Sequence, residues 1–305
     1  MSILYFFESI RNPILDTFFS IITKFGEETV FMVAALIIFW CVDKHKGYYI
    51  LSIGFMGTVI NQFLKITCRI PRPWVKDPNF TIVESARAEA TGYSFPSGHT
   101  QSSVSTFGGI AKSTGKKWIK VLSIVLAVLV PVSRMYLGVH TPQDVLVSVA
   151  VALILIFAFH PIIKKSETNH KYMWWLIGAM VLISLGNLLY VTLYKFPADI
   201  DAANLQSAVK NAYKLFGAII GIVVVYYFDS KHLDFKTSAP MLGQILKVVL
   251  GLVVIVAIKE GLKPLFSVLG IESPIMVQSF RYFLLVVAAG VIWPLTFKYF
   301  SKSGK

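Results

Sequence analysis

Hydrophobic residues in this chain are gathered into long runs that polar residues seldom interrupt. The hydrocarbon core of a bilayer is about 30 Å thick, and a helix of roughly 20 apolar residues crosses it. Runs that are apolar on every side therefore predict an all-α, polytopic bundle of about nine transmembrane helices. The predicted spans are Thr29–Val42, Tyr48–Ile66, Thr100–Ala111, Trp118–Tyr136, Val145–Ile163, Tyr172–Tyr194, Ala212–Phe228, Leu242–Leu262 and Phe280–Phe300. The first and third runs are short and need flanking residues to cross.

A different pattern precedes the first predicted span. Its apolar residues recur at helical spacing and form one stripe: Ile14, Leu15, Phe18, Phe19, Ile22 and Phe25. A helix with one apolar face lies in the membrane interface, so residues 1–27 are predicted to form an interfacial N-terminal helix. The segment lacks the basic start and the cleavage site of a signal peptide, and we expect it to be retained.

The composition agrees with a membrane protein. The 305 residues are 55% hydrophobic and 15% charged, and the mean hydropathy is +0.67, whereas soluble domains are about 45–50% apolar and about 25% charged. A soluble enzyme, a disordered chain and a disulfide scaffold do not fit these values. The two cysteines, Cys41 and Cys68, fall at helix ends on opposite predicted sides of the membrane, so we expect no disulfide between them.

The net charge is explained by membrane topology. The chain carries 29 Lys and Arg against 16 Asp and Glu, a formal charge of +13. Such an excess suggests nucleic acid in a soluble protein, but there is no zinc-finger spacing and no basic helix here, so no nucleic-acid partner is expected. Lysines are concentrated in alternate connections, including residues 43–47, 112–120 and 164–171. These connections are predicted to face the cytoplasm and to contact anionic membrane lipids.

Three polar segments are brought to the outer face by the predicted topology. They are Lys65–Pro73 at the end of the second span, Pro96–His99 at the start of the third, and Ser133–Asp144 between the fourth and fifth. A lone His or Arg at a helix end usually contacts lipid headgroups or extends to the interface. The complete set on one side of the membrane, by contrast, indicates a catalytic site.

Phosphate is the ligand that these residue types favour. Arg72 and Arg134 offer guanidinium forks that bind phosphate in a bidentate manner, and Lys65 adds a point charge. Ser97 and Gly98 stand at a predicted helix start, where backbone N–H groups and the helix dipole attract an anion. Glycine also allows close approach of the backbone. These groups can stabilise the charge of phosphoryl transfer without a metal or a cofactor.

The two histidines divide the covalent chemistry. A neutral imidazole can attack phosphorus while a protonated one donates to the leaving oxygen. Asp144 follows His140 by four residues, a helical spacing at which the carboxylate can fix the imidazole tautomer. Pro142 suits a first helical turn, with Thr141 as the N-cap. His140 is therefore the predicted nucleophile, and His99 the predicted acid.

At these residues the sequence resembles the type 2 phosphatidic acid phosphatase superfamily, an integral membrane lipid phosphatase family that also includes glucose-6-phosphatase and vanadium haloperoxidases. Its three motifs are present as Lys-x6-Arg-Pro, Pro-Ser-Gly-His and Ser-Arg-x5-His-x3-Asp. The matching residues are Lys65, Arg72, Pro73, Pro96, Ser97, Gly98, His99, Ser133, Arg134, His140 and Asp144.

The resemblance implies a mechanism. His140 would form a phosphohistidine, Asp144 would orient it, and His99 would protonate the leaving group and then activate water. Lys65, Arg72, Ser97, Gly98 and Arg134 would hold the phosphate, with no metal required.

The resemblance and the span pattern together divide the chain into three parts. Residues 1–27 are the interfacial helix, residues 28–165 a phosphatase core with the three motifs, and residues 166–305 four additional transmembrane helices. With four predicted spans after the last motif, the layout of the chain is similar to that of the glucose-6-phosphatase and sphingosine phosphate phosphatase branches. The aromatic and charged loop of residues 74–95 is either a lid over a lipid headgroup or an ordinary interfacial loop.

The resulting prediction is a phosphatase that acts on a lipid phosphate monoester or diphosphate at the outer face of the membrane. Substrates of the phosphatidic acid, phosphatidylglycerol phosphate, undecaprenyl diphosphate and sphingoid phosphate types all remain open. A lipid phosphotransferase and a glucose-6-phosphatase-like sugar phosphatase are alternatives with the same chemistry. A lipid transporter or scaffold with a vestigial site is an alternative of another class. The low cysteine count and short extramembrane connections favour a bacterial cytoplasmic membrane.

Overall fold

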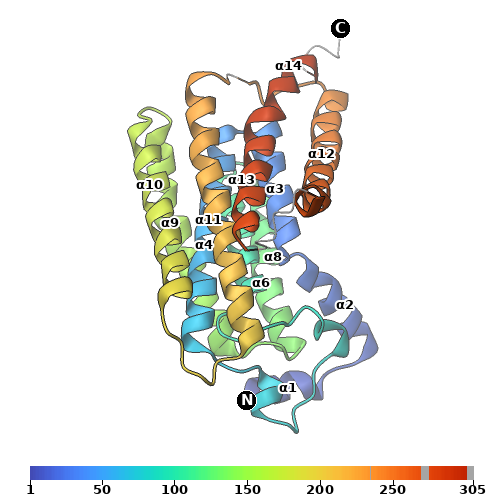
Figure 1. Cartoon of the computed structure of the whole chain (residues 1–305). Coiled ribbons are helices and arrows are strands. Elements are labelled where there is room, and N and C mark those ends of the chain that lie inside the picture. Colours follow the sequence, from blue (N-terminus) through green and yellow to red (C-terminus); the bar gives the residue numbers. More distant parts are fainter. Residues whose placement is uncertain (234, 269–274, 301–305) are drawn as a thin grey trace. The chain divides into compact units, whose positions relative to one another are not determined.

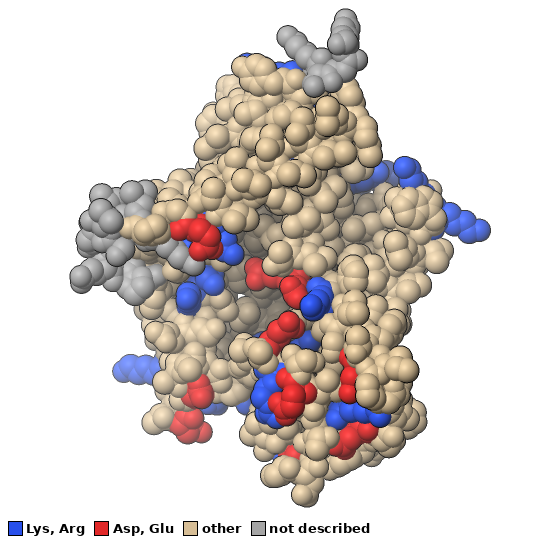
Figure 2. Space-filling model, turned by 90° about the vertical axis from the view of Figure 1, so that its right-hand side faces the viewer, with Lys and Arg blue, Asp and Glu red and all other residues tan. Residues whose placement is uncertain are grey.

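The computed structural model describes residues 1–233, 235–268 and 275–300, with only the backbone described at residues 263, 265, 267 and 268. Every regular element in these ranges is helical, which confirms the all-α prediction. Seven helical segments are long and apolar enough to cross a membrane, and a shorter apolar helix covers Glu28–Cys41. The chain is an integral membrane protein. On the face drawn in Figure 2, broad areas carry no charged residue, as expected for surfaces that contact lipid.

The helices follow one another along the chain. They are α1 (Ser2–Ser9), α2 (Pro13–Lys24), α3 (Glu28–Cys41), α4 (Lys44–Cys68), α5 (Pro73–Lys76), η1 (Glu84–Ala86), α6 (Gly98–Ser103), η2 (Val104–Gly108), α7 (Gly109–Ser113), α8 (Lys117–Tyr136), α9 (Pro142–Ser166), α10 (Lys171–Leu193), α11 (Ala202–Lys231), α12 (Met241–Val268), α13 (Met276–Val287), η3 (Ala288–Ile292), η4 (Pro294–Thr296) and α14 (Phe297–Phe300) (Figure 1). The connection between α5 and α6 is the long loop that contains η1.

The chain forms two compact units. The first contains residues 1–34, 49–160 and 199–205, and it holds all three motif segments. The second contains residues 35–48, 161–198 and 206–305. Cys41 and Cys68 are both free.

The N-terminal segment of the first unit is two helices, not the single interfacial helix that we predicted. The chain turns at Asn12, whose side-chain oxygen accepts hydrogen bonds from the backbone N–H groups of Ile14 and Leu15 and so caps α2. An N-cap of this kind satisfies helix N–H groups that have no partner within the helix. The one-face apolar stripe coincides with α2, and the earlier residues form α1.

Helix α2 packs along α8. The hydroxyl of Tyr136 donates to Asp16 Oδ1 at 2.7 Å, and the rings of Phe19 and Tyr136 lie 4.3 Å apart. The α2 segment is thereby fixed to the helix that carries the third motif.

The third predicted span lies within a continuous helical segment of residues 98–113. It begins as α6, passes through the π-helical turn η2 and ends as α7. Ser97 caps its start by accepting the backbone N–H of Thr100 at 3.3 Å. The helix start thus lies at Gly98, inside the second motif.

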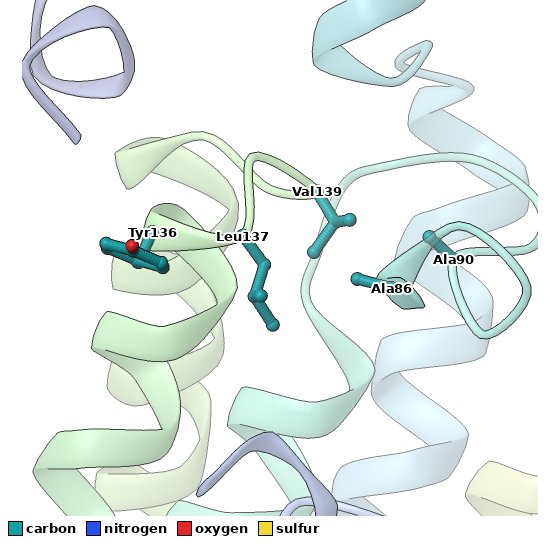
Figure 3. Close-up of a cluster of buried hydrophobic side chains, with 5 residues drawn as sticks. All are labelled: Ala86, Ala90, Tyr136, Leu137 and Val139. Carbon is teal, nitrogen blue, oxygen red and sulfur yellow. The ribbon is translucent and has the colours of Figure 1, made fainter. Parts of the chain in front are cut away.

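The loop of residues 74–95 is packed against the rest of the first unit. Ala86 and Ala90 are buried together with Leu137 and Val139 from the α8–α9 connection, as Figure 3 shows. The backbone N–H of Val83 donates to the carbonyl of Leu137 at 3.1 Å. The loop is therefore held beside the third motif.

Two helices extend beyond the membrane spans that the sequence predicted. Helix α11 begins at Ala202, ten residues before the predicted start at Ala212, and α12 continues to Val268, beyond the predicted end at Leu262. The last predicted span, Phe280–Phe300, lies within one apolar helical segment, Met276–Phe300, in which α13 passes into a π-helical turn and then a 3-10 turn at Pro294. The added first turns of α11 contain neither proline nor glycine, whereas α12 continues past Pro264.

Candidate active site

The first and third motifs meet at Arg72 and His140. Arg72 Nη1 lies 3.0 Å from His140 Nε2 and donates to the carbonyl of Val139 at 3.0 Å. Arg72 is 6% exposed and His140 is 2% exposed. A contact between motifs 68 residues apart confirms that the fold brings these two segments together.

The contact with Arg72 determines the tautomer of His140. A guanidinium has donors and no acceptor, so His140 Nε2 must accept, and its lone pair points at Arg72. The ring proton then resides on Nδ1, which faces Asp144 Oδ2 and Ser94 Oγ, each at 3.5 Å. The ring thus presents its unprotonated Nε2 on the side that faces Arg72.

Asp144 is held firmly on the other side of the ring. Its Oδ2 accepts the backbone N–H of Thr141 at 2.8 Å and the hydroxyl of Ser94 at 2.5 Å. The backbone N–H of Asp144 in turn donates to Thr141 Oγ1 at 3.3 Å, which makes a reciprocal cap at the start of α9. Thr141 is therefore the N-cap, as predicted. The carboxylate is 1% exposed, so its geometry is set by these bonds.

Lys65 and Arg72 are oriented by three consecutive backbone carbonyls. Lys65 Nζ donates to Tyr93 at 2.7 Å, while Arg72 Nε and Nη2 donate to Gly92 and Thr91 at 3.0 and 2.7 Å. Gly92 has a φ of 69°, a left-handed conformation that glycine adopts without strain. The end of the 74–95 loop is therefore a wall of the site.

Arg134 and His99 differ from the other site residues because each leaves a buried nitrogen unbonded. Arg134 is 1% exposed, and its Nη1 donates to Thr23 Oγ1 at 2.7 Å. Its Nε, like His99 Nε2, is buried without a hydrogen-bond partner among the described residues. Glu89 Oε2 is 3.5 Å from His99 Nε2. An unsatisfied buried donor costs about 1–3 kcal/mol, which a bound acceptor would recover.

The second motif is tied to the third through its backbone. Ser97 donates its N–H to the carbonyl of Asp144 at 3.2 Å, and its own carbonyl accepts the hydroxyl of Ser148 at 2.9 Å. A Cβ added at Gly98 would come no closer than 4.0 Å to Asn61 Oδ1. Packing within the protein therefore leaves space beside Gly98.

Burial and like charges make both histidines neutral. Burial, together with Arg72, Arg134 and Lys65, holds the pKa of His140 well below its usual range. Burial and the same cations, with Arg134 foremost, lower the pKa of His99 to about 3. Bound negative charge would oppose the like-charge contribution. The arrangement can therefore accept an anion, attack it with His140 Nε2 and transfer a proton through His99.

Comparison with known proteins identifies the family. Residues 46–168 match the PAP2 superfamily, and residues 213–305 match "PAP2 superfamily phosphatase, transmembrane extension". A curated Bacillus subtilis protein, "Undecaprenyl-diphosphatase BcrC", is 31% identical over 154 residues, covering 49% of this chain and 75% of the relative. The chain belongs to the PAP2 superfamily.

Other relatives of this PAP2 protein match over shorter parts of their own length. A "Probable sphingosine-1-phosphate phosphatase" from Dictyostelium discoideum is 32% identical, covering 50% of this chain and 39% of that protein. An "Undecaprenyl-diphosphatase" from Sulfolobus acidocaldarius is 32% identical, covering 41% of this chain and 59% of that protein. The matches thus span less than two thirds of either relative.

Several residues of the candidate site were not predicted from the sequence. Ser94 contacts both His140 and Asp144, Glu89 approaches His99, and Thr23 bonds Arg134. Ser94 lies two residues before the second motif, and this proximity was the available signal. Glu89 lies in the charged loop of residues 74–95, and nothing in the sequence sets it apart from the other charges there. Thr23 lies outside the matched residues 46–168 and carries no signal of its own.

Proposed function

We propose that the protein is an integral membrane phosphatase that hydrolyses a lipid phosphate monoester or diphosphate through a phosphohistidine at His140. The observation that carries the proposal is the pair of unbonded buried nitrogens, Arg134 Nε and His99 Nε2, beside the neutral His140. Both can donate to phosphate oxygens once His99 is protonated. Relatives named as phosphatases support the same reaction class.

The phosphate would be held by the residues that the motifs supply. Lys65, Arg72 and Arg134 neutralise its charge, and the backbone at Ser97 and Gly98 donates from the helix start. The open space beside Gly98 supports this role, because a side chain there would meet the ligand before it met the protein. Three fixed cations around one phosphate favour the charge that develops on its equatorial oxygens.

Phosphate binding would release the nucleophile. Arg72 Nη1, which contacts His140 Nε2 in the free site, would turn to a phosphate oxygen. His140 Nε2 would then attack phosphorus as the bond to the leaving oxygen breaks, and Asp144 would stabilise the positive charge on the ring through Nδ1–H. Negative charge on the phosphate would raise the pKa of His99, so that Nε2–H can protonate the leaving oxygen.

The second half of the reaction would reverse the role of His99. A water that approaches from the leaving-group side would lose its proton to His99 Nε2 and attack phosphorus. The P–N bond to His140 would break, and inorganic phosphate would leave. The proton gained by His99 in this step restores the acid for the next cycle.

A lipid is the substrate class that the membrane setting supports. Relatives carry names that refer to sphingosine-1-phosphate and undecaprenyl diphosphate, and another Bacillus subtilis relative is a "Phosphatidylglycerophosphatase B". The shared element of these substrates is a phosphate at the membrane surface. We propose that residues 28–165 form the catalytic core and residues 166–305 four further spans. By the positive-inside rule, the site would lie on the extracytoplasmic side of a bacterial cytoplasmic membrane.

The proposal is tested with purified protein and a substrate panel in the presence of EDTA. Free phosphate should be released from at least one lipid among phosphatidic acid, phosphatidylglycerol phosphate, undecaprenyl diphosphate and sphingosine 1-phosphate, and not from glucose 6-phosphate. Vanadate should inhibit. Phosphate appearing on an added lipid acceptor instead would indicate the phosphotransferase. Lipid transfer between liposomes with no phosphate release from any substrate would contradict the proposal.

A further inference from the structure

We infer that the corner between α2 and α3 belongs to the active site, and that Thr23 is a positioning residue for Arg134. The inference rests on the proposed function and extends it to a part of the chain that precedes the matched residues 46–168. Two contacts from this corner support it, one to Arg134 and one to His99.

The first contact fixes the guanidinium of Arg134. Thr23 Oγ1 accepts from Nη1 at 2.7 Å, and both residues are nearly inaccessible, at 4% and 1% exposed. An arginine side chain carries about 2 kcal/mol of rotamer entropy. A hydrogen bond in a buried site therefore determines where the remaining donors point.

The bond to Thr23 leaves one edge of the guanidinium for a ligand. A guanidinium binds an oxyanion in a bidentate manner through two adjacent nitrogens. With Nη1 held by Thr23, the edge formed by Nε and Nη2 remains, and Nε is the buried nitrogen that has no partner among the described residues. Thr23 thus holds the arginine with its free edge ready for two phosphate oxygens.

The second contact places His99. Gly26 approaches so closely that a Cβ at this position would lie 2.9 Å from both the Cβ and the backbone oxygen of His99, and 2.8 Å from Val130 Cγ1. Any side chain at this position would have to displace the start of α6 or the Val130 side chain of α8. Glycine at position 26 therefore lets the corner pack directly on the backbone of the proposed acid.

The corner itself is anchored at both ends. Upstream, α2 is bound to α8 through Asp16 and Tyr136. Downstream, the Phe25 ring lies 6.4 Å from the Phe107 ring of η2, and the Gly26 N–H donates to the Thr23 carbonyl at 2.9 Å. The Thr23 hydroxyl, which accepts the hydrogen bond from Arg134, is therefore held in place.

The test separates the hydroxyl of Thr23 from its volume. Thr23→Val keeps the shape and removes the acceptor, and Thr23→Ser keeps the acceptor. Thr17→Val is a matched control on the same helix, because the Thr17 hydroxyl donates within its own turn, to the Pro13 carbonyl at 2.8 Å. Each variant is assayed for kcat and KM on the best lipid of the panel, and for orthovanadate binding by the shift in apparent Tm.

We expect Thr23→Val to lower kcat about tenfold and to weaken vanadate binding about tenfold, the loss that corresponds to one hydrogen bond of about 1.4 kcal/mol. KM should change less, because Arg134 acts most strongly on transition-state charge. Thr23→Ser should recover most of both losses, and Thr17→Val should match the wild type.

Two results would overturn the inference. One is a Thr23→Val protein with wild-type kcat and vanadate binding, and the other is a Thr23→Ser protein as impaired as Thr23→Val, which would indicate a packing role. Failure of the proposed function is distinguishable, because the wild type would then release no phosphate from any lipid. The vanadate shifts of the three variants would still decide the role of Thr23.

Discussion

Arg134 in the first unit and Lys247 in the second are both almost fully buried, but their hydrogen bonding differs. Lys247 in the second unit is 0% exposed, and its Nζ donates to the carbonyls of Lys236 and Thr237 at 3.1 and 3.2 Å and lies 4.6 Å from the centre of the Phe297 ring. Arg134 in the first unit is equally buried but keeps one unbonded nitrogen.

The contrast indicates a structural charge at Lys247 and a ligand-binding one at Arg134. An unbonded buried nitrogen is not by itself the sign of a ligand site, because Arg281 Nε in the second unit also has no partner among the described residues. A buried charge is costly unless it is paired and hydrogen-bonded. Lys247 meets this condition within the protein, where its ammonium donates to two backbone carbonyls. Arg134 meets it fully only when an anion arrives. The same contrast applies to histidines, because His170 in the second unit bonds the Tyr226 hydroxyl at 2.9 Å, whereas His99 Nε2 has no such partner among the described residues.

The largest expected effect on kcat comes from replacing a histidine of the site, compared with a histidine of the second unit. His140→Ala should lower kcat by about 10³–10⁶-fold, because the proposed nucleophile is removed. His170→Ala, the control in the second unit, should retain activity. The measurement is phosphate release in single-turnover reactions. Undiminished release by His140→Ala would refute the assigned nucleophile.

The two buried cations give the second comparison. Arg134→Ala should lower kcat about 10²–10³-fold, the usual cost of losing a transition-state donor. Lys247→Met should leave kcat close to wild type and lower the unfolding free energy by about 1–3 kcal/mol, because two carbonyls lose their donor. Steady-state kinetics and apparent Tm measure both effects. A catalytic loss in Lys247→Met with an unchanged Tm would contradict the division of roles.

A smaller effect is expected for the residue that holds Asp144. Ser94→Ala removes the hydroxyl that donates to Asp144 Oδ2 and should lower kcat about tenfold. Ser184→Ala is the control in the second unit, since the Ser184 hydroxyl donates to the carbonyl of Val181 three residues earlier on the same helix. Equal kinetics for the two variants would show that Ser94 does not orient the pair His140 and Asp144.

The last effect concerns stability against pH and not catalysis. The pKa values of His140 and His99 lie below the unfolded value of about 6.5. Below that pH the unfolded chain binds protons that the folded chain does not. The contribution of the two histidines to the unfolding free energy is therefore complete above about pH 6.5. At lower pH it falls by about 1.4 kcal/mol for each pH unit and each histidine. The apparent Tm should decrease from pH 7 to pH 5, and less so in His99→Gln. An identical pH slope in that variant would contradict the neutral state of His99.

Sequence reasoning succeeded where chemistry follows from residue type and spacing. Long apolar runs predicted the helices, and the motif around His140 and Asp144 predicted a helix start at Pro142 and a cap at Thr141, both of which the structure confirms. The meeting of the motif segments also followed from topology, because alternate helix ends share one side of a membrane.

The remaining features depend on contacts between distant segments. The contacts of Thr91, Gly92 and Tyr93 are made by backbone carbonyls, so the side chains at these positions do not predict them. Thr23 is an ordinary residue of an amphipathic helix until the fold sets it beside Arg134. Helix ends such as Ala202 are also poorly predicted, because polar residues continue a helix as readily as they end it.

The central claim is that His140 carries the phosphoryl group during turnover, and direct trapping tests it. The protein is mixed with a lipid substrate labelled in its phosphate, quenched in alkali within one turnover, digested and analysed by mass spectrometry. We predict a phosphate that is stable in base and labile in acid on the peptide containing His140, and no such label in His140→Ala. Label on another residue, or wild-type turnover with no labelled peptide at any quench time, would contradict the account.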